Sequence, residues 1–548
     1  MIAQLMNNQH EQDPSPLKVN PSEVENLITE IKASSLSPQS KELVVKILVS
    51  FLWLSRQLAE KRLSIHKLLK LFFGSKTEKS NKKDEANKDD KESTSTPKPE
   101  DEKKKPVKGH GKNGSAKFEN AKRESIVHPT LKAKDICPVC EDGKLYEFGF
   151  AEVLRLFGQP PLIAKIYELA RFRCANCQEL FTAPLPEEAG NNRHHESANA
   201  MVGLLNYGSG MPFYRLEALQ KQLGTPLADA TQFDMAESLA NCAGPIFNYL
   251  KTLASSADQQ GFDDTPMPIL SLIKENEQLL ENERKGMQTS AIMATSGVNK
   301  IALFITGRQH AGENIGDLLQ NRNPLLSKVI QMSDASANNF CHAYSDLVIT
   351  ALCMDHGRRN FYDLLIFFPQ DCQHVIKELG IIYKNDDTAK VLNLTPIERL
   401  HFHQKHSAEV MNNLNTWMEE KIENKEVEPN SELGKAINYF TKHWNGLTEF
   451  LRTAGAPLSN AEVERLVKRC VLRRKASLFY KTQAGAWIGD ILMSVIETCR
   501  FAEKNTFEYL VVLQKYASRV KANPEHWLPW NYEQALVALT KNTHLFSV

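Results

Sequence analysis

Two things are scarce in this chain of 548 residues: an excess of charge of one sign and a long uninterrupted apolar run. Lysine and arginine number 67 against 66 aspartates and glutamates, so any basic surface has to be local. The most apolar stretch, residues 43–54, contains Lys46 and is too short to cross a bilayer. The first residues show no basic-then-apolar targeting pattern. These absences predict a cytoplasmic protein without a membrane partner.

The cysteines predict a metal site. Four of the ten cysteines form two Cys-x-x-Cys pairs, Cys137 with Cys140 and Cys174 with Cys177. In a large chain without a signal peptide, such pairs favour metal binding over disulfides. Two residues between thiolates allow both to reach one tetrahedral Zn²⁺, and two such pairs fill a closed structural site. The sequence therefore predicts structural zinc in a DNA-binding module at 126–185, although the 33-residue gap between the pairs requires an insertion in a zinc ribbon. Its strands are expected at residues 145–148 and 170–172.

Composition divides the rest of the chain. Residues 1–74 are predicted to be helical, and their apolar spacing leaves two interpretations open: a helix packed within its own domain, or a dimerising helix. Residues 75–125 are almost free of large apolar side chains and are predicted to be a disordered charged linker. Residues 190–257 and 501–548 are predicted to be helical, the former as a DNA-binding region.

The segment 258–500 carries a pattern typical of a nuclease core. Three strands, a helix and a fourth strand follow one another, as in an RNase H-like fold, which places acidic residues of the first and fourth strands side by side. Asp263 and Asp334 stand at those two places. Carboxylates suit Mg²⁺, and two such ions about 3.5–4 Å apart can hold the attacking and leaving oxygens of a phosphodiester. Pro266 and Pro268 do not suit a central strand, so the first strand is expected to end near Thr265. The expected strands after it lie at 289–295, 300–306 and 328–333, and the helix lies at 311–320.

Eight segments support a more specific interpretation. They are LKLFFGSKTEKS at residues 69–80, the cysteine region 137–177, Gly210-Met-Pro-Phe-Tyr-Arg215, Phe262-Asp-Asp-Thr-Pro266, Gly307-Arg-Gln-His310 with Gln331-Met-Ser-Asp334, Cys353-Met-Asp-His-Gly-Arg-Arg-Asn-Phe361, Leu458-Ser-Asn-Ala-Glu-Val-Glu-Arg465 and Leu528-Pro-Trp-Asn531. In this order they resemble the insertion-sequence 66 family of bacterial transposases over nearly the whole chain.

The resemblance implies a DDE-type DNA transposase with a mixed α and α/β fold. Its catalytic core would be RNase H-like with a large helical insertion, preceded by the zinc finger and the N-terminal helical segment. Asp263, Asp334 and Glu464 would be the catalytic residues and would hold Mg²⁺ or Mn²⁺. The partners implied are double-stranded DNA, as element ends and target, a second copy of the chain when DNA is bound, and small accessory proteins.

The chain departs from the family pattern near two of these carboxylates. Ser459 and Ala461 replace an aspartate and an asparagine, which raises the alternative of a catalytically decayed DNA-binding protein on a transposase scaffold. Glu462 competes with Glu464 for the role of third ligand, and Asp264 competes with Asp263 for that of the first. A third interpretation is a zinc-ribbon regulator fused to an unrelated helical domain.

Basic side chains accompany the third carboxylate. Arg465, Lys468 and Arg469 share one face of the expected helix, which can be a DNA-contacting face or simply a solvated one. We predict DNA contact. The complete set of predicted DNA-binding residues is His356, Arg358, Arg359, Arg465, Lys468, Arg469, Arg473, Arg474 and Lys475.

Overall fold

The computed structural model describes residues 27–31, 33–34, 37, 41, 44–46, 125–126, 128–136, 138, 143–146, 159–190 and 192–543. The chain divides into two compact units, residues 1–148 and 149–548. Most of the predicted N-terminal helical region lies outside the described residues, as does the predicted linker apart from its last residue. In the first unit, an antiparallel bridge joins Ile136 to Lys144.

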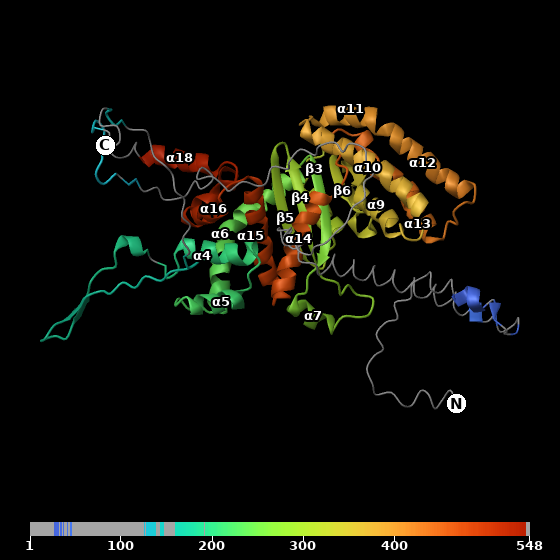
Figure 1. The fold of residues 1–548 in the computed structure, drawn as a ribbon. Helices are drawn as coiled ribbons and strands as arrows, with labels where there is room; N and C mark the ends of the chain where they lie inside the picture. The colour runs from blue at the N-terminus through green and yellow to red at the C-terminus, as the bar shows by residue number, and fades with distance from the viewer. Residues whose placement is uncertain are drawn as a thin grey trace. The chain divides into compact units, whose positions relative to one another are not determined.

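A five-stranded sheet forms the centre of the second unit (Figure 1). Its strand order is β5-β4-β3-β6-β7. The first three strands along the chain pair in antiparallel fashion, β6 runs parallel to β3, and β7 runs parallel to β6. The carboxyl ends of the three parallel strands therefore meet at one edge of the sheet. The bounds are β3 (Gln259–Pro266), β4 (Gln288–Ser296), β5 (Asn299–Gly307), β6 (Val329–Ser333) and β7 (Val348–Leu352).

Four of these strands match the predicted ones to within two residues, and the predicted helix is α8 (Ala311–Leu319). Two features were not predicted. The fifth strand, β7, extends the sheet, and the segment after β3 turns into a short helix, α7 (Leu270–Asn276). The strand does end beside Thr265, as Pro266 requires, because that proline has no N–H for further pairing.

Helices cover both faces of the sheet. The strands are therefore buried on both sides, and β6 is buried at every residue. Residues 260, 262 and 264 of β3 face α6 (Asp229–Ser255) and α8, as the hydrogen bond from Gln260 Nε2 to the Ala254 carbonyl shows. Residues 261, 263 and 265 face α14 (Ala461–Ser477) on the other side. The two faces of β3 therefore meet different helices, which matters for the adjacent aspartates of this strand.

The free edge of β5 is closed by α15 (Gln483–Phe501). Three side chains spaced four residues apart on this helix accept hydrogen bonds from every second N–H of the strand. Thr498 bonds to Ala302 at 3.0 Å, Ser494 to Phe304 at 2.9 Å and Asp490 to Thr306 at 2.8 Å. A helical repeat of four residues thus satisfies an edge strand that would otherwise expose unpaired donors.

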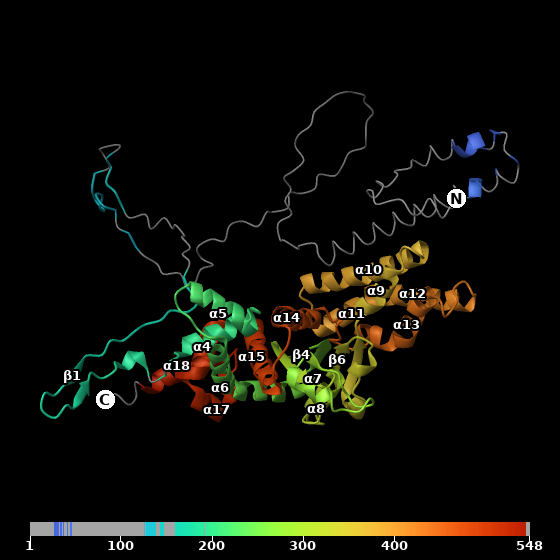
Figure 2. The same ribbon diagram turned by 90° about the horizontal axis from the view of Figure 1, so that it is seen from below.

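A helical insertion separates β7 from α14, as predicted, and has its own apolar core on β6 and β7. It packs beside the sheet in both ribbon views (Figures 1 and 2). Its helices are α9 (Met354–Asp363), α10 (Pro369–Val391), α11 (Pro396–His406), α12 (Ala408–Glu423) and α13 (Glu432–Leu447).

The helices that precede the sheet pack with those at the end of the chain. Gln514 accepts a hydrogen bond from Asn199 at 3.0 Å and donates one to the Glu196 carbonyl at 2.9 Å, which joins α16 to α4. The region 190–257 is helical as predicted, and so are the described residues after 501. The bounds are α4 (Glu196–Gly203), α5 (Phe213–Gln222), α16 (Thr506–Lys515), α17 (Ala517–Ala522) and α18 (Tyr532–Thr543).

Candidate active site

Asp263 and Asp264 are neighbours on β3, so their side chains point to opposite faces of the sheet. Asp264 accepts hydrogen bonds from Ser290 Oγ at 2.6 Å and from the Ala311 N–H at 2.9 Å, and it lies 3.1 Å from His310 Nδ1. It joins β3 to β4 and to the start of α8. Asp263 accepts a hydrogen bond from the N–H of Asp264 at 2.8 Å. Asp263 is therefore the carboxylate of this pair that is available to a ligand.

Asp334 follows directly after β6, beside Asp263. Gly261 pairs with Met332 in the parallel register, which puts the two aspartates at corresponding places, each two residues further on. One oxygen of Asp334 accepts hydrogen bonds from Asn339 Nδ2 and from the Ser336 N–H at 3.0 Å. These bonds fix the carboxylate, whose charge acts on Asp263.

Glu464 comes from α14, and two residues hold this helix close to β3. A Cβ built on Gly261 would lie 2.6 Å from Val463 Cγ2, so only a glycine permits this approach without movement. Buried Asn460, at the start of α14, donates from Nδ2 to the Phe262 carbonyl at 3.1 Å. Its backbone N–H donates to Cys353 Sγ at 3.2 Å. The first turn of α14 is thereby tied to the end of β7 and to the strand that carries Asp263.

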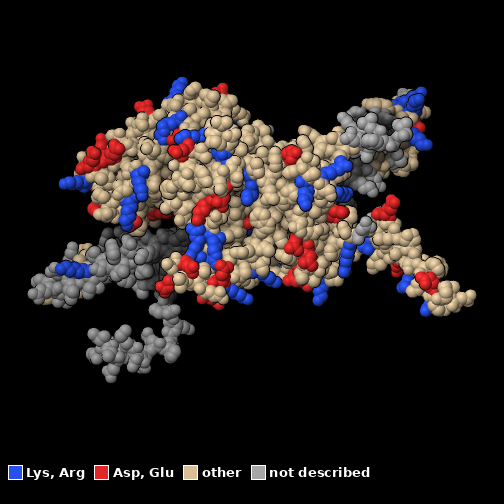
Figure 3. Space-filling view, turned by 180° about the vertical axis from the view of Figure 1, so that it is seen from behind, with Lys and Arg blue, Asp and Glu red and all other residues tan. Residues whose placement is uncertain are grey.

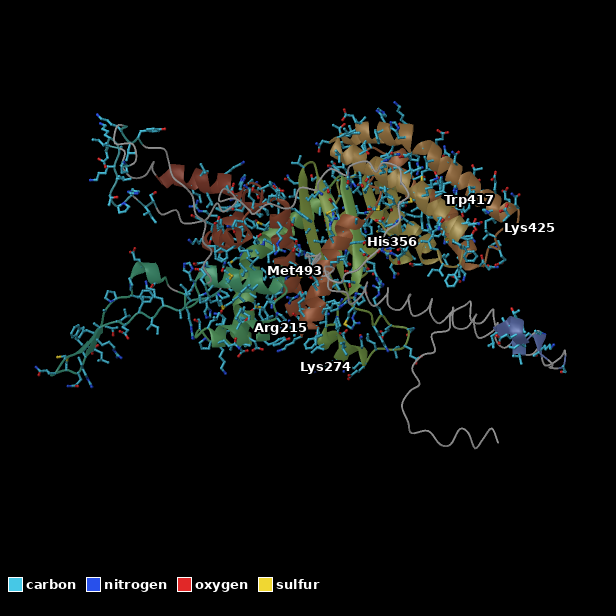
Figure 4. All side chains as sticks on the ribbon, viewed as in Figure 1. Arg215, Lys274, His356, Trp417, Lys425 and Met493 are labelled. Carbon is cyan, nitrogen blue, oxygen red and sulfur yellow. The ribbon has the colours of Figure 1, made fainter. Side chains whose placement is uncertain are left out.

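Cys353, His356 and Glu464 form a compact group beside the sheet. The Cys353 sulfur, a ring nitrogen of His356 and a carboxylate oxygen of Glu464 all lie within 4.8 Å of one another. Burial raises the pKa of Cys353 to about 11, so it is a thiol that accepts the Asn460 N–H and not a thiolate. His356 Nδ1 and Glu464 Oε1 are buried and have no hydrogen-bond partner among the described residues. Figure 4 labels His356 beside the sheet.

The three carboxylates fit a divalent cation. The pKa of Asp263 is raised to about 6, mainly by burial and also by the nearby carboxylate of Asp334, while the Asp264 N–H and His356 act to lower it. Two carboxylates that share a poorly solvated place repel each other, and a cation between them would relieve that repulsion. The donors are hard oxygens, as Mg²⁺ and Mn²⁺ prefer. The buried, unpartnered oxygen of Glu464 is the third donor of this kind.

The structure separates the two candidate glutamates of α14. Glu462 is exposed, and both of its oxygens accept hydrogen bonds from Lys300 Nζ, at 2.8 and 2.9 Å. It lies two residues before Glu464, which on a helix of about 3.6 residues per turn places it on another face. Glu462 belongs to a surface ion pair, and Glu464 belongs to the group with Cys353 and His356.

The predicted DNA-binding residues divide by exposure. Arg465, Lys468, Arg469, Lys475 and Arg359 are exposed, and Arg358 is half-buried with its guanidinium 5.9 Å from the centre of the Tyr383 ring. On the face seen in Figure 3, basic and acidic side chains are interspersed, with no continuous basic surface. This agrees with the net charge of +1.

Two basic residues near the end of α14 have structural partners. Arg473 is 7% exposed, and it donates to Asn206 and, at 3.0 Å, to the Tyr480 hydroxyl. The prediction that Arg473 contacts DNA is therefore wrong for this structure: the helical pattern placed it next to exposed cations but on the buried side. Arg474 is half-buried and donates to Thr265 Oγ1 at 3.1 Å and to the Pro266 carbonyl.

The structure describes two of the four cysteines predicted to bind zinc. Cys137 and Cys140 lie outside the described residues. Cys174 and Cys177 lie in the turn between β1 (Arg171–Arg173) and β2 (Leu180–Thr182), which pair with each other in antiparallel fashion. The Cys177 N–H, which bonds to the Cys174 sulfur, lowers the pKa of that thiol more than its other neighbours do. Such a turn suits one half of a metal knuckle.

Sequence reasoning missed the residues that hold the site together. The family pattern drew attention to Ser459 and Ala461 and not to Asn460 between them. An asparagine at the start of a helix can bond to a neighbouring strand through its amide, as Asn460 does. Gly261 precedes Asp263 by two residues on the same face of the strand, and this spacing was the available indication of a close helix contact. Nothing in the sequence pointed to the pairing of His310 with Asp264.

The amino-acid sequence is similar to those of known proteins. The sequence model described as "Transposase IS66 family" matches residues 193–487, more than half of the chain. Three curated relatives come from Sinorhizobium fredii (strain NBRC 101917 / NGR234) and are named as uncharacterized proteins. Uncharacterized protein y4hP is 24% identical over 447 residues, 77% of each chain. Uncharacterized protein y4jD is 27% identical over 187 residues, 33% of this chain and 36% of its own. Uncharacterized protein y4qI is 22% identical over 354 residues, 61% and 62% of the two chains. The chain belongs to the IS66 transposase family.

Proposed function

We propose that this protein is a DNA transposase that cuts and joins phosphodiesters with a divalent-metal centre held by Asp263, Asp334 and Glu464. Family membership supports a transposase role and, with it, DNA binding. The observations that carry the proposal are that the half-buried Asp263 feels the charges of Asp334 and His356, and that a Glu464 oxygen lies within 4.8 Å of a ring nitrogen of the same His356. The five-stranded sheet and the family match over 193–487 rule out the interpretation of a zinc ribbon fused to an unrelated helical domain.

We further propose that the core is RNase H-like. An antiparallel meander of three strands, followed by a helix and two parallel strands in the order β5-β4-β3-β6-β7, supports this assignment. Asp263 then lies on the central strand, Asp334 after its parallel neighbour, and Glu464 on the helix that covers them. In sequence, the long helical insertion lies between the second and third carboxylates. Its apolar core packs on β6 and β7.

Each protein group has a distinct task in this chemistry. The divalent cations would polarise the scissile phosphate and stabilise the charge that develops on its oxygens. Asp263, Asp334 and Glu464 hold them, and Asn460 keeps Glu464 against β3. Water then attacks a phosphodiester at the element end, and the freed 3′-hydroxyl attacks target DNA, without a covalent protein–DNA intermediate. The exposed cations of α14 hold flanking phosphates.

A partner and a second metal complete the proposal. Two element ends must be held at once, so we propose that the DNA-bound form contains at least two copies of the chain. Zn²⁺ bound by Cys137, Cys140, Cys174 and Cys177 would stabilise the DNA-binding module without taking part in cleavage, since four thiolates leave no open position. As partners we also propose small accessory proteins, which the family resemblance implies.

Strand cleavage and joining on the DNA that flanks the coding sequence, with Mg²⁺ or Mn²⁺, tests the central claim. Asp263→Asn, Asp334→Asn and Glu464→Gln should each lower the cleavage rate by at least about 1,000-fold while DNA binding persists. Glu462→Gln is the matched control, because it removes an equal charge two residues away on the same helix, and it should keep near-wild-type cleavage.

The alternatives give different results in the same assay. If cleavage survives Glu464→Gln and disappears in Glu462→Gln, the assignment of the third ligand is wrong. If the wild-type protein binds element ends specifically and never cuts them with either metal, the decayed-scaffold interpretation replaces the enzyme. Added accessory proteins belong in every reaction, so that their absence does not imitate an inactive site.

A further inference from the structure

A cavity of about 450 Å³ lies beyond the C-terminal end of α14. Its walls come from α5, from the first turns of α6, and from the loop that joins α14 to α15. Tyr214 of α5 and Phe479 of the loop stand at this cavity with 56% and 38% of their surfaces exposed. Figure 4 labels the neighbouring Arg215 on α5, near the lower ends of α14 and α15 in that view. The metal centre proposed above does not use this cavity.

The inner wall of the cavity is aromatic and rigid. The Arg473 guanidinium lies between two rings, 4.2 Å from the centre of Tyr207 and 5.0 Å from that of Tyr480. Phe213 packs edge-on against Phe233 with ring centres 6.3 Å apart. The buried hydroxyl of Ser477, at the cavity, has no hydrogen-bond partner among the described residues. A flat aromatic ligand with polar edges would contact the exposed parts of this wall.

The polar groups around the cavity complement a nucleotide. Asp229 and Asp234 of α6 line it, are exposed, and form no ion pair in the part of the chain that the structure describes. Carboxylates accept hydrogen bonds from the exocyclic amino groups of cytosine and adenine. Lys481 also lines the cavity and Arg215 lies beside it, which supplies cations for a phosphate.

We infer that this cavity takes one unstacked, amino-bearing base of the DNA strand that runs along α14. The inference rests on the proposed DNA-binding function but not on cleavage. Ser477 lies 13 residues after Glu464, which is roughly 20 Å along a helix at about 1.5 Å per residue. At about 3.4 Å per nucleotide of one strand, the base would lie about six nucleotides from the scissile phosphate. The exposed Lys468 and Lys475 lie between the two places.

A fluorescent base provides the test. Full-length protein is titrated with duplex DNA that carries one unpaired 2-aminopurine, and with the fully matched duplex. Stacking on the aromatic wall should quench the fluorescence, and the unpaired base should bind about tenfold more tightly than the matched duplex. The double variant Tyr214→Ala, Phe479→Ala should lose both effects and keep the affinity for matched duplex. Phe367→Ala, which removes an exposed ring from the helical insertion, should change neither.

A second variant covers the case in which the double variant folds poorly. Asp234→Asn alters one exposed carboxylate and should reduce the preference for an unpaired cytosine over an unpaired thymine, which has no amino group. If matched DNA is bound and cut but no variant changes the quenching, the inference is overturned and the proposed function stands. If the double variant changes the sedimentation of DNA-free protein, the cavity binds a second copy of the chain instead. If the wild type binds no DNA, both proposals fall.

Discussion

Gly261→Ala tests whether close packing of α14 on β3 positions Glu464. The added Cβ would lie 2.6 Å from Val463 Cγ2 and 3.2 Å from Asn460 Oδ1, and the first distance is shorter than real contacts allow. Helix and strand must therefore separate, which should cost about 1–3 kcal/mol of stability, as overpacked cores do. A shift of Glu464 by up to about 1 Å should lower the cleavage rate about 100-fold.

Val463→Ala completes a double-mutant cycle, because it removes the methyl group that the new Cβ meets. Alone it should cost about 2 kcal/mol through lost burial and a small cavity. The double variant should be destabilised by at least about 1 kcal/mol less than the sum of the two single destabilisations, and part of the cleavage rate should return. Urea unfolding followed by circular dichroism gives the stabilities, and the element-end assay gives the rates. Strict additivity with no recovery of cleavage would refute the reasoning.

Three further predictions concern the edge of the sheet and the cysteines. Burial raises the pKa of Asp490 to about 8, so its contribution to stability is full below about pH 4 and is lost as the pH rises to 8. The free energy of unfolding should therefore fall with pH by up to ~1.4 kcal/mol per pH unit between pH 5 and 8. Asp490→Asn, which imitates the protonated acid, should remove this pH dependence in urea titrations. Thr498→Val keeps the shape but leaves the Ala302 N–H unpaired and should cost ~1–3 kcal/mol, whereas a neutral result would show that water reaches that edge. Cys174→Ser should lower the bound zinc measured by elemental analysis and weaken DNA binding with little effect on the far-UV spectrum of the core; full zinc content in this variant would contradict the ligand assignment.

The sequence predicted the strands of the core because β4, β5 and β6 are apolar runs bounded by turn residues, and such local patterns survive in the fold. It missed β7 because Val348–Leu352 is short and follows an irregular turn, and its strand character depends on pairing with β6. Similarly, residues 270–276 have no feature that excludes a strand. Their helix begins directly after Ile269, which forms a bridge with Tyr480, a contact more than 200 residues apart in sequence.

The sequence alone could not predict roles that depend on which neighbouring element a side chain faces. Asp263 and Asp264 are equivalent in composition, and only the helices on each side of β3 make one a structural residue and the other a free carboxylate. The same holds for Arg473, which belongs to a basic run yet faces the core. A run of cations on a helix specifies charge but not which of its side chains meets Asn206 and Tyr480 in the folded chain.

The departures at Ser459 and Ala461 bear on activity only through what those positions do. Ser459 Oγ accepts the Ala461 N–H at 3.4 Å, which is a local bond at the start of α14 that aspartate would also make. The residue between them, Asn460, carries the long-range bonds to β3 and to Cys353, and it is retained. Since neither replaced side chain is needed to hold Glu464 against Asp263, the substitutions leave the carboxylate group assembled. The decayed-scaffold interpretation therefore requires a defect elsewhere, and comparing Ser459→Asp with the wild type in the cleavage assay tests this: equal rates agree with it, and a large gain in the variant would contradict it.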